Sequence, residues 1–308
     1  MGVKDRRAPV DSPVGSQYAP PTVKKSAPST HATAYKHNER KRWNTFSARY
    51  ATMAIQEFRP FGRRLIELAA LQKGMWVLDV ATGPGEPALT IARHVGPRGL
   101  VLGIDFSPAM IRLAQARGRQ IGALKTHFRE MDAERLALDA MTFDRVFCRF
   151  GLMLMPHAER ALQEMYRVLV PGGRVAVAVW GTERTVNTLR VVSQALERHN
   201  IATPLPGAPD FFRFSRAGVM ERALRAVGFT DVRAERMTVE WVFKGPAAFW
   251  DSMKQGPSLQ RAFAKASPPV RRAVKDDIVC AVEQFWCRGK LRIPNEAVLA
   301  VGVKKPSS

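Results

Sequence analysis

Short apolar segments alternate with segments of helical periodicity through the middle of the chain. Residues 76–80 form an apolar run with the length and composition of a strand that is buried on both faces. A few residues later, Ala88, Leu89 and Ile91 recur at a spacing that covers one face of a helix. The pattern therefore predicts a strand, a tight turn and a helix in succession.

Four more segments before residue 181 have the pattern of a buried strand. Segments with helical periodicity separate several of these predicted strands. The further predicted strands cover residues 100–104, 126–131, 145–150 and 170–180. Strands that alternate with helices indicate a parallel sheet with helices on its faces, which is an α/β fold. Ligands bind to such sheets at the carboxyl ends of the strands. Four polar side chains stand at or near those ends: Asp79, Asp105, Asp132 and Arg149.

The second half of the chain contains longer elements. Residues 181–230 read as helix, loop and helix, 230–243 as a strand, 246–289 as helical and 295–305 as a last strand. We therefore expect one ordered domain over residues 39–308. Its parts are a core over 72–180, an insertion over 181–230, and C-terminal strands and helices over 231–303.

The beginning of the chain differs in composition. Residues 1–38 are rich in Pro, Ser, Thr and Ala, and they predict a disordered basic tail. Order is expected to begin where Trp43, Phe46 and Tyr50 recur at helical spacing. Such a helix either packs in the core or covers a ligand of the sheet.

The turn after the first predicted strand spells GPGEPA over residues 83–88, which satisfies the loose dinucleotide-binding pattern. Two features argue against a diphosphate: the prolines remove N–H donors, and Glu86 adds negative charge. Glu86 and Asp79 favour a cation instead. S-adenosylmethionine carries a sulfonium and an ammonium group and no phosphate. A structural turn without a ligand stays open as the alternative.

Asp105 ends the second predicted strand, about twenty residues beyond Gly85. At this spacing a carboxylate accepts hydrogen bonds from a ribose diol in nucleotide-binding folds. The position also precedes a helix that Ser107 is expected to cap, so a helix-dipole role is compatible with it. Phe106 and Met110 offer apolar surface to an adenine, or they pack in the core.

The net charge of +21 over 308 residues raises the question of a nucleic-acid partner. The excess is spread, with +6 over residues 1–42, +6 over 43–180 and +9 over 181–308, and no nucleic-acid-binding module is recognisable. Diffuse basicity is typical of solvated surface. It also suits anionic substrates or weak contact with RNA.

Cysteine content and hydropathy bound the class of protein further. The three cysteines, Cys148, Cys280 and Cys287, lack the paired spacing of a disulfide framework or a zinc site, so no metal is expected. No apolar run approaches the ~20 residues that span a bilayer, and no signal peptide is recognisable. The sequence therefore predicts a cytoplasmic protein without a membrane span.

Five blocks of the sequence together resemble one family. The blocks are VLDVATGPGEPAL, GIDFSPAMI, REMDAERL, FDRVFCRFGLMLMP and EMYRVLVPGGRVAVAVW. Their order and spacing are similar to those of the class I S-adenosylmethionine-dependent methyltransferases, in a branch similar to the ubiquinone and menaquinone C-methyltransferases. The resemblance covers residues 43–180. It implies a Rossmann-like, seven-stranded and mostly parallel sheet sandwiched by helices, with an antiparallel last strand and a helical substrate-covering insertion.

The resemblance also implies S-adenosylmethionine as the cofactor and assigns its contacts. The methionine and sulfonium side falls to Asp79, Ala81, Gly83 and Gly85. The ribose falls to Asp105, and the adenine side falls to Phe106, Asp132 and Ala133. Thr82 of the same turn and Met110 are further candidates for cofactor contacts. At the end of the fourth strand, the residues beside the cofactor are Cys148 and Arg149.

Methyl transfer needs an aligned acceptor, excluded water and, for some acceptors, a base. The catalytic candidates are His157, which also suits the flank of a helix, and Arg149, which also suits a structural ion pair. Phe211, Phe212 and Phe214 either line an apolar acceptor pocket or anchor a loop. The expected partner is a small, apolar or aromatic methyl acceptor. The alternatives are a methyltransferase for RNA or protein, a NAD-type oxidoreductase and a non-catalytic adenosine-ligand binding protein.

Overall fold

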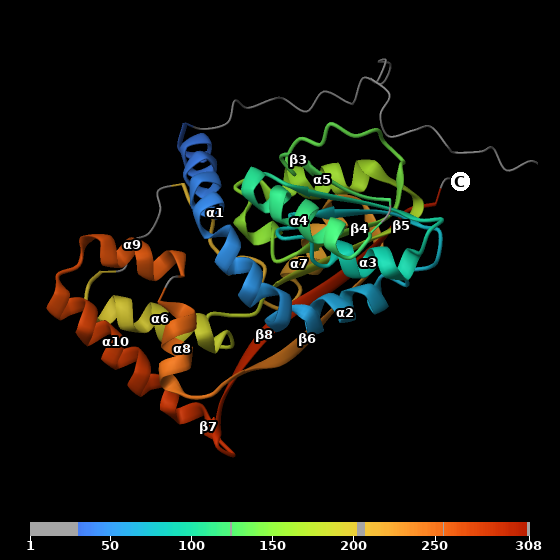
Figure 1. Cartoon of the computed structure of the whole chain (residues 1–308). Helices are drawn as coiled ribbons and strands as arrows, with labels where there is room; N and C mark the ends of the chain where they lie inside the picture. The colour runs from blue at the N-terminus through green and yellow to red at the C-terminus, as the bar shows by residue number, and fades with distance from the viewer. Residues whose placement is uncertain (1–29, 124, 202–206, 255, 307–308) are drawn as a thin grey trace, which may run out of the picture.

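One mixed sheet organises the computed structural model, which describes residues 30–123, 125–201, 207–254 and 256–306 (Figure 1). Along the sheet the strands follow the order β3-β2-β1-β4-β5-β8-β6. Their bounds are β1 Trp76–Val80, β2 Leu100–Asp105, β3 Thr126–Glu130, β4 Phe143–Arg149, β5 Leu169–Trp180, β6 Phe229–Phe243 and β8 Lys290–Lys304. The first five strands in this order are parallel to one another, and β8 lies antiparallel between β5 and β6. The predicted α/β sheet and its antiparallel last strand are confirmed.

Helices lie along the sheet. Their bounds are α1 Thr30–Glu57, α2 Arg59–Leu68, α3 Ala88–Val95, α4 Pro108–Gln120, α5 Ala158–Val168, α6 Asn187–Arg198, α7 Val219–Ala226, α8 Pro246–Met253, α9 Pro257–Lys265 and α10 Pro268–Val282. Within the sandwich, α2 and α5 pack on β5, while α3 and α4 pack on β2 and its neighbours. The N-terminus of α4 confirms the predicted cap, because the Ser107 hydroxyl accepts a hydrogen bond from the Met110 N–H at 3.2 Å.

The apolar runs that predicted the strands form the core. In β1 the side chains of Val77, Leu78 and Val80 are completely buried, as a strand covered on both faces requires. Burial of each such side chain stabilises the fold by about 1.5–3 kcal/mol. The same burial encloses Asp79, the polar member of the run, which has no exposed surface.

A separate group of helices stands beside the long ribbon that β6 and β8 form. It contains α6, α8, α9 and α10, which gather at the lower left of Figure 1, away from the parallel strands. Here α10 packs on both α6 and α8. The predicted insertion over 181–230 is therefore divided: α6 joins this group, whereas α7 packs against β6.

Three expectations about the elements need correction. The sheet has an eighth strand, β7 (Trp286–Cys287), which pairs with the start of β8 through a turn at Arg288 and Gly289. The helical stretch expected to reach residue 289 consequently ends earlier. At the other end, α1 begins at Thr30, so the tail boundary at residue 38 was placed too late. Residues 1–29 lie outside the described residues.

In the parts of the chain that the structure describes, no helix combines the length and the apolar character needed to cross a bilayer.

Candidate active site

A cavity of about 830 Å³, with its open mouth included, lies at the carboxyl ends of β1, β2 and β4 and against α1. It brings together eight of the residues with predicted cofactor contacts: Ala81, Gly83, Asp105, Phe106, Met110, Asp132, Ala133 and Arg149. The topology explains this convergence, since adjacent parallel strands end at the same edge of a sheet. Four others, Asp79, Thr82, Gly85 and Cys148, are buried and do not line the cavity.

The glycine turn forms one wall of the cavity. Ala81 and Gly83 both have a φ of 55°, which is the left-handed region that glycine adopts freely. Gly85 has a φ of 91° and serves packing, because a β-carbon there would lie 3.2 Å from the β-carbon of Ala114. Thr82 supports the turn from inside through a 2.6 Å hydrogen bond from its hydroxyl to Asp79.

Asp79 and Asp105 are the buried carboxyls of this wall. One oxygen of Asp79 accepts hydrogen bonds from Thr82 and from the Ala88 N–H, while its other oxygen is buried with no partner among the described residues. Burial raises the pKa of Asp79 to about 7, against the hydrogen bond from Thr82. Asp105 accepts the N–H groups of Gly83 and Ser107, each at 2.9 Å. Burial raises its pKa to about 6, and these hydrogen bonds oppose the shift.

Glu86 does not take part in the cavity. Its carboxylate lies 3.2 Å from Arg117 and accepts a 2.8 Å hydrogen bond from the Thr90 hydroxyl. The expectation that Glu86 favours a cationic ligand is therefore wrong, because Arg117 already neutralises its charge. The negative charge available to a ligand comes from the two buried aspartates.

Another part of the cavity lining follows β4. Arg149 lines the cavity and donates to the backbone carbonyls of Phe58 and Glu86 at 2.9 and 2.8 Å. Burial lowers its pKa. The expected pairing with a carboxylate is thus replaced by two carbonyls, which favours the structural role. Phe150 follows with a φ of 59°, unusual for a bulky residue, and stacks on Trp180 at a centroid distance of 4.2 Å.

Asp132, Ala133 and Glu134 close one end of the cavity. The exposed fraction of the Asp132 side chain is 48%, whereas that of Glu134 is 5%. Lys36 of α1 contacts both carboxylates, at 2.7 Å from Asp132 and 2.5 Å from Glu134. The sequence reading named Asp132 and Ala133 and missed Glu134, the more buried of the two acids.

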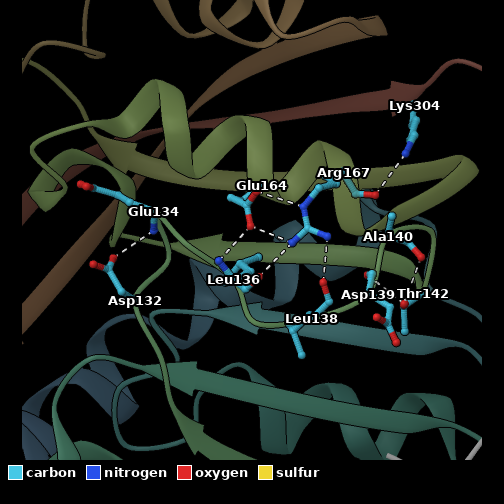
Figure 2. A network of polar contacts seen from close by, with 10 residues as sticks. All are labelled: Asp132, Glu134, Leu136, Leu138, Asp139, Ala140, Thr142, Glu164, Arg167 and Lys304. Atoms are coloured by element: carbon cyan, nitrogen blue, oxygen red, sulfur yellow. Dashed lines mark hydrogen bonds and ion pairs between the residues drawn. The ribbon is translucent and has the colours of Figure 1, made fainter. Parts of the chain in front are cut away.

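A polar network holds the loop that follows these residues (Figure 2). The guanidinium of Arg167 donates to the carbonyls of Leu136 and Leu138 at 2.9 and 2.8 Å. Glu164 pairs with Arg167 at 2.7 Å and accepts the N–H of Leu136 at 2.8 Å. Figure 2 also shows Lys304 of β8, which donates to the Arg167 carbonyl. Helix α5 thereby fixes the loop that begins at the end of the cavity.

The roof of the cavity is one face of α1, the helix for which the sequence left a covering role open. Tyr35, Glu39, Trp43 and Tyr50 from this helix line the cavity. Their spacing of four, four and seven residues was the available signal, but Tyr35 falls within the predicted tail over residues 1–38. Burial raises the pKa of Tyr50 to about 12, so its hydroxyl stays protonated at neutral pH. The interpretation of this helix as a cover of the ligand site fits its position.

The remaining candidates lie outside the cavity. His157 is the residue before α5, its N–H donates to Glu134 at 2.9 Å, and it does not line the cavity. Cys148 is fully buried, and burial raises the pKa of its thiol to about 12. The three phenylalanines, Phe211, Phe212 and Phe214, also lie away from the cavity lining. Arg213 among them donates to the carbonyl of Leu152, which agrees with the loop-anchoring alternative.

Among the described residues, no three His, Cys, Asp or Glu side chains cluster in a way that could hold a metal ion.

Comparison with known proteins places the strand-turn-helix core in a family. Residues 77–173 match the model of the methyltransferase domain. The ubiquinone/menaquinone biosynthesis C-methyltransferase UbiE of Bordetella parapertussis is 38% identical over 147 residues, which are 48% of this chain and 50% of that protein. The aklanonic acid methyltransferase DauC of Streptomyces sp. is 32% identical over 144 residues, which are 47% and 66% of the two chains. Residues 77–173 are therefore similar to the methyltransferase domain family, as the five motifs predicted.

Solved structures extend the likeness beyond this segment at the level of the fold. The structure of a putative methyltransferase from Bacillus halodurans C-125 matches with a TM-score of 0.54 at 19% identity, covering 80% of this chain and 99% of that one. By sequence, the chain spans about half the length of the first curated relative named above.

Proposed function

We propose that the protein is an S-adenosylmethionine-dependent methyltransferase that acts on a small-molecule acceptor. Support comes from the domain match together with the two buried aspartates of the glycine turn. The observation that carries the proposal is Asp105, which lines the cavity beside the glycine turn and is held there by the N–H groups of Gly83 and Ser107. Its carboxylate is thus positioned to accept hydrogen bonds from the hydroxyl groups of a bound ribose.

The hydrogen bonds of the turn argue against a dinucleotide. Four of its backbone N–H groups already donate within the protein; they belong to Thr82, Gly83, Gly85 and Ala88. A pyrophosphate needs such donors at a helix N-terminus, and here they are committed. The cavity therefore suits an adenosine ligand without phosphates, which disfavours the NAD-type alternative.

Different residues in and beside the cavity would bind different parts of the cofactor. Asp105 would accept the ribose hydroxyls, and Asp79 would complement the positive charge of the methionine part. Asp132, Ala133 and Glu134 would bound the adenine, with Phe106 and Met110 against its faces. When bound, this cofactor supplies a methyl carbon activated by a positively charged sulfur. The protein then has to align the acceptor and exclude water, since the reaction is an in-line displacement.

The proposed acceptor is small and apolar or aromatic. The cavity lining includes five aromatic or thioether side chains: Tyr35, Trp43, Tyr50, Phe150 and Met155. Such surfaces bind flat apolar molecules and leave little room for a macromolecule. Tyr50 would donate a hydrogen bond rather than act as a base. A cytoplasmic location remains the expectation from composition.

Calorimetric titration with S-adenosylhomocysteine tests the proposed site. We expect the wild-type protein to bind this product and not NAD. Asp105→Ala should weaken binding by about 1.5–3 kcal/mol, because the ribose loses a charged hydrogen-bond acceptor. Asp276→Ala is the matched control, since Asp276 is an exposed residue of α10. Equal affinity in the two variants would remove Asp105 from the site, and tight binding of NAD would reverse the proposal.

A further inference from the structure

Helix α1 carries a second row of side chains beside the row that lines the cavity. Lys36, Arg40 and Asn44 are spaced four residues apart and therefore share one face of the helix. All three bind the core. Lys36 contacts Asp132 and Glu134, Arg40 pairs with Glu130, and the side-chain oxygen of Asn44 accepts a 2.7 Å hydrogen bond from the Ser107 hydroxyl.

Glu134 is the most buried acid of this contact. Its second oxygen accepts the N–H of His157 at 2.9 Å, at the N-terminus of α5. One carboxylate thus joins three elements: α1 through Lys36, α5 through His157, and the loop after β3. An ion pair whose acid is 95% buried is far less screened by solvent than an exposed pair.

The paired residues lie at the cavity itself. Lys36 and Glu134 both belong to its lining, at the end that Asp132 bounds. Any movement of the first turns of α1 away from this end separates Lys36 from Glu134. Closure of the cavity and formation of this ion pair are therefore one event.

We propose that the Lys36–Glu134 ion pair latches α1 over the cavity and controls the exchange of the adenosine ligand. Lys36 is then a positioning residue, which acts through the helix that it holds. The inference rests on the proposed function, because it takes the cavity to be the adenosine site. The ammonium group of Lys36 would control the rate of ligand release, whereas Asp79 and Asp105 would supply most of the binding affinity.

Stopped-flow displacement measures the rate at which S-adenosylhomocysteine is released, and this rate tests the latch. In Lys36→Met we expect release about tenfold faster than in the wild type, equivalent to about 1.4 kcal/mol. Lys36→Arg should restore slow release, because it keeps the cation. Lys41→Met is the matched control: Lys41 is exposed on the same helix, and no ion pair to it exists in the described structure.

A second variant separates the latch from general loosening of the helix. Glu134→Gln keeps an acceptor for the His157 N–H and removes the charge that Lys36 contacts. The double variant Lys36→Met/Glu134→Gln should release ligand no faster than Lys36→Met alone, since Lys36→Met already removes the ion pair that Glu134→Gln breaks. Additive effects would contradict the latch.

Hydrogen exchange of the α1 amides in the ligand-free protein gives an independent readout. Exchange over residues 36–44 should be faster in Lys36→Met than in Lys41→Met. Equal release and equal exchange in these two variants would overturn the latch while leaving the proposed function intact. Failure of the wild type to bind S-adenosylhomocysteine would overturn both.

Discussion

At the scale of single residues, two buried carboxyls define the character of the site. Burial raises the pKa of Asp79 to about 7 and that of Asp105 to about 6, so both carboxyls change protonation state near neutral pH in the ligand-free protein. Hydroxyl donors and a positive charge favour the ionised forms. A ligand that supplies them would therefore bind with the ionised carboxylates, and its affinity would depend on pH.

The pH dependence of binding tests this account for Asp105. Because the pKa of Asp105 is raised to about 6, the carboxylate is ionised at pH 8 and about nine-tenths protonated at pH 5. The affinity advantage of the wild type over Asp105→Asn for S-adenosylhomocysteine should therefore shrink about tenfold between pH 8 and pH 5. Calorimetry at several pH values measures the ratio, and the titration of Asp79 cancels because both proteins contain it. A ratio that does not change with pH would contradict the role of Asp105.

The same shift has a consequence for stability, with the opposite sign to that of a salt-bridged acid. The folded protein binds the Asp105 proton more tightly than the unfolded chain does. Its contribution to stability is therefore present at low pH and is lost as pH rises from about 4 to about 6.

At the scale of elements, α1 combines two functions on adjacent faces. One row of residues roofs the cavity, and the neighbouring row pairs with the core. Its first turns belong to this arrangement, since Tyr35 is 5% exposed and Lys36 holds Glu134. The composition of residues 30–38 resembles the tail before them, which is why the sequence alone assigned them to it.

Two truncations distinguish the tail from the helix. A chain that starts at Thr30 should keep the melting temperature and the S-adenosylhomocysteine affinity of the full protein, as tail composition predicts. A chain that starts at Glu39 loses Tyr35 and Lys36, and should lose about 2 kcal/mol of stability from the buried ring alone. Calorimetry and thermal unfolding measure both quantities. Identical behaviour of the two chains would show that the first turns of α1 are dispensable.

At the scale of the whole molecule, charge and enclosure point to different partners. The net charge of +21 is spread over the chain, whereas the cavity is roofed by a helix and lined by aromatic side chains. Electrostatic attraction to RNA without a docking module is weak and falls steeply with salt. The cavity walls surround the site of methyl transfer itself, so we give the cavity more weight than the net charge when we propose the acceptor.

Methyl-labelled S-adenosylmethionine offered with total RNA, or with a small-metabolite extract, tests that choice. We expect label in the extractable organic fraction, and we expect it to persist when salt is raised from 50 to 200 mM, the span over which phosphate contacts weaken by about a thousandfold or more. Asp105→Ala is the negative control for cofactor-dependent labelling. Salt-sensitive label confined to RNA would instead establish a macromolecular acceptor.

Local pattern determined the order of strands and helices, the glycine turn and the carboxyl-end positions of Asp79, Asp105 and Asp132. These features depend on periodicity and on steric rules that act over a few residues, so the sequence displays them directly. The antiparallel place of β8 came from family resemblance, because register between distant strands leaves no local mark.

Only the tertiary structure decided which of the predicted residues meet, and what closes over them. Glu86 looked free in the sequence, but Arg117 neutralises it from α4. Glu134 and Lys36 are 98 residues apart in the chain, and neither has a local signal that points to the other. Their pairing, and with it the roof over the cavity, follows from the docking of a helix on a sheet edge. That docking depends on contacts between distant segments, which is the physical reason why the sequence by itself predicted the floor of the site and left the role of its covering helix open.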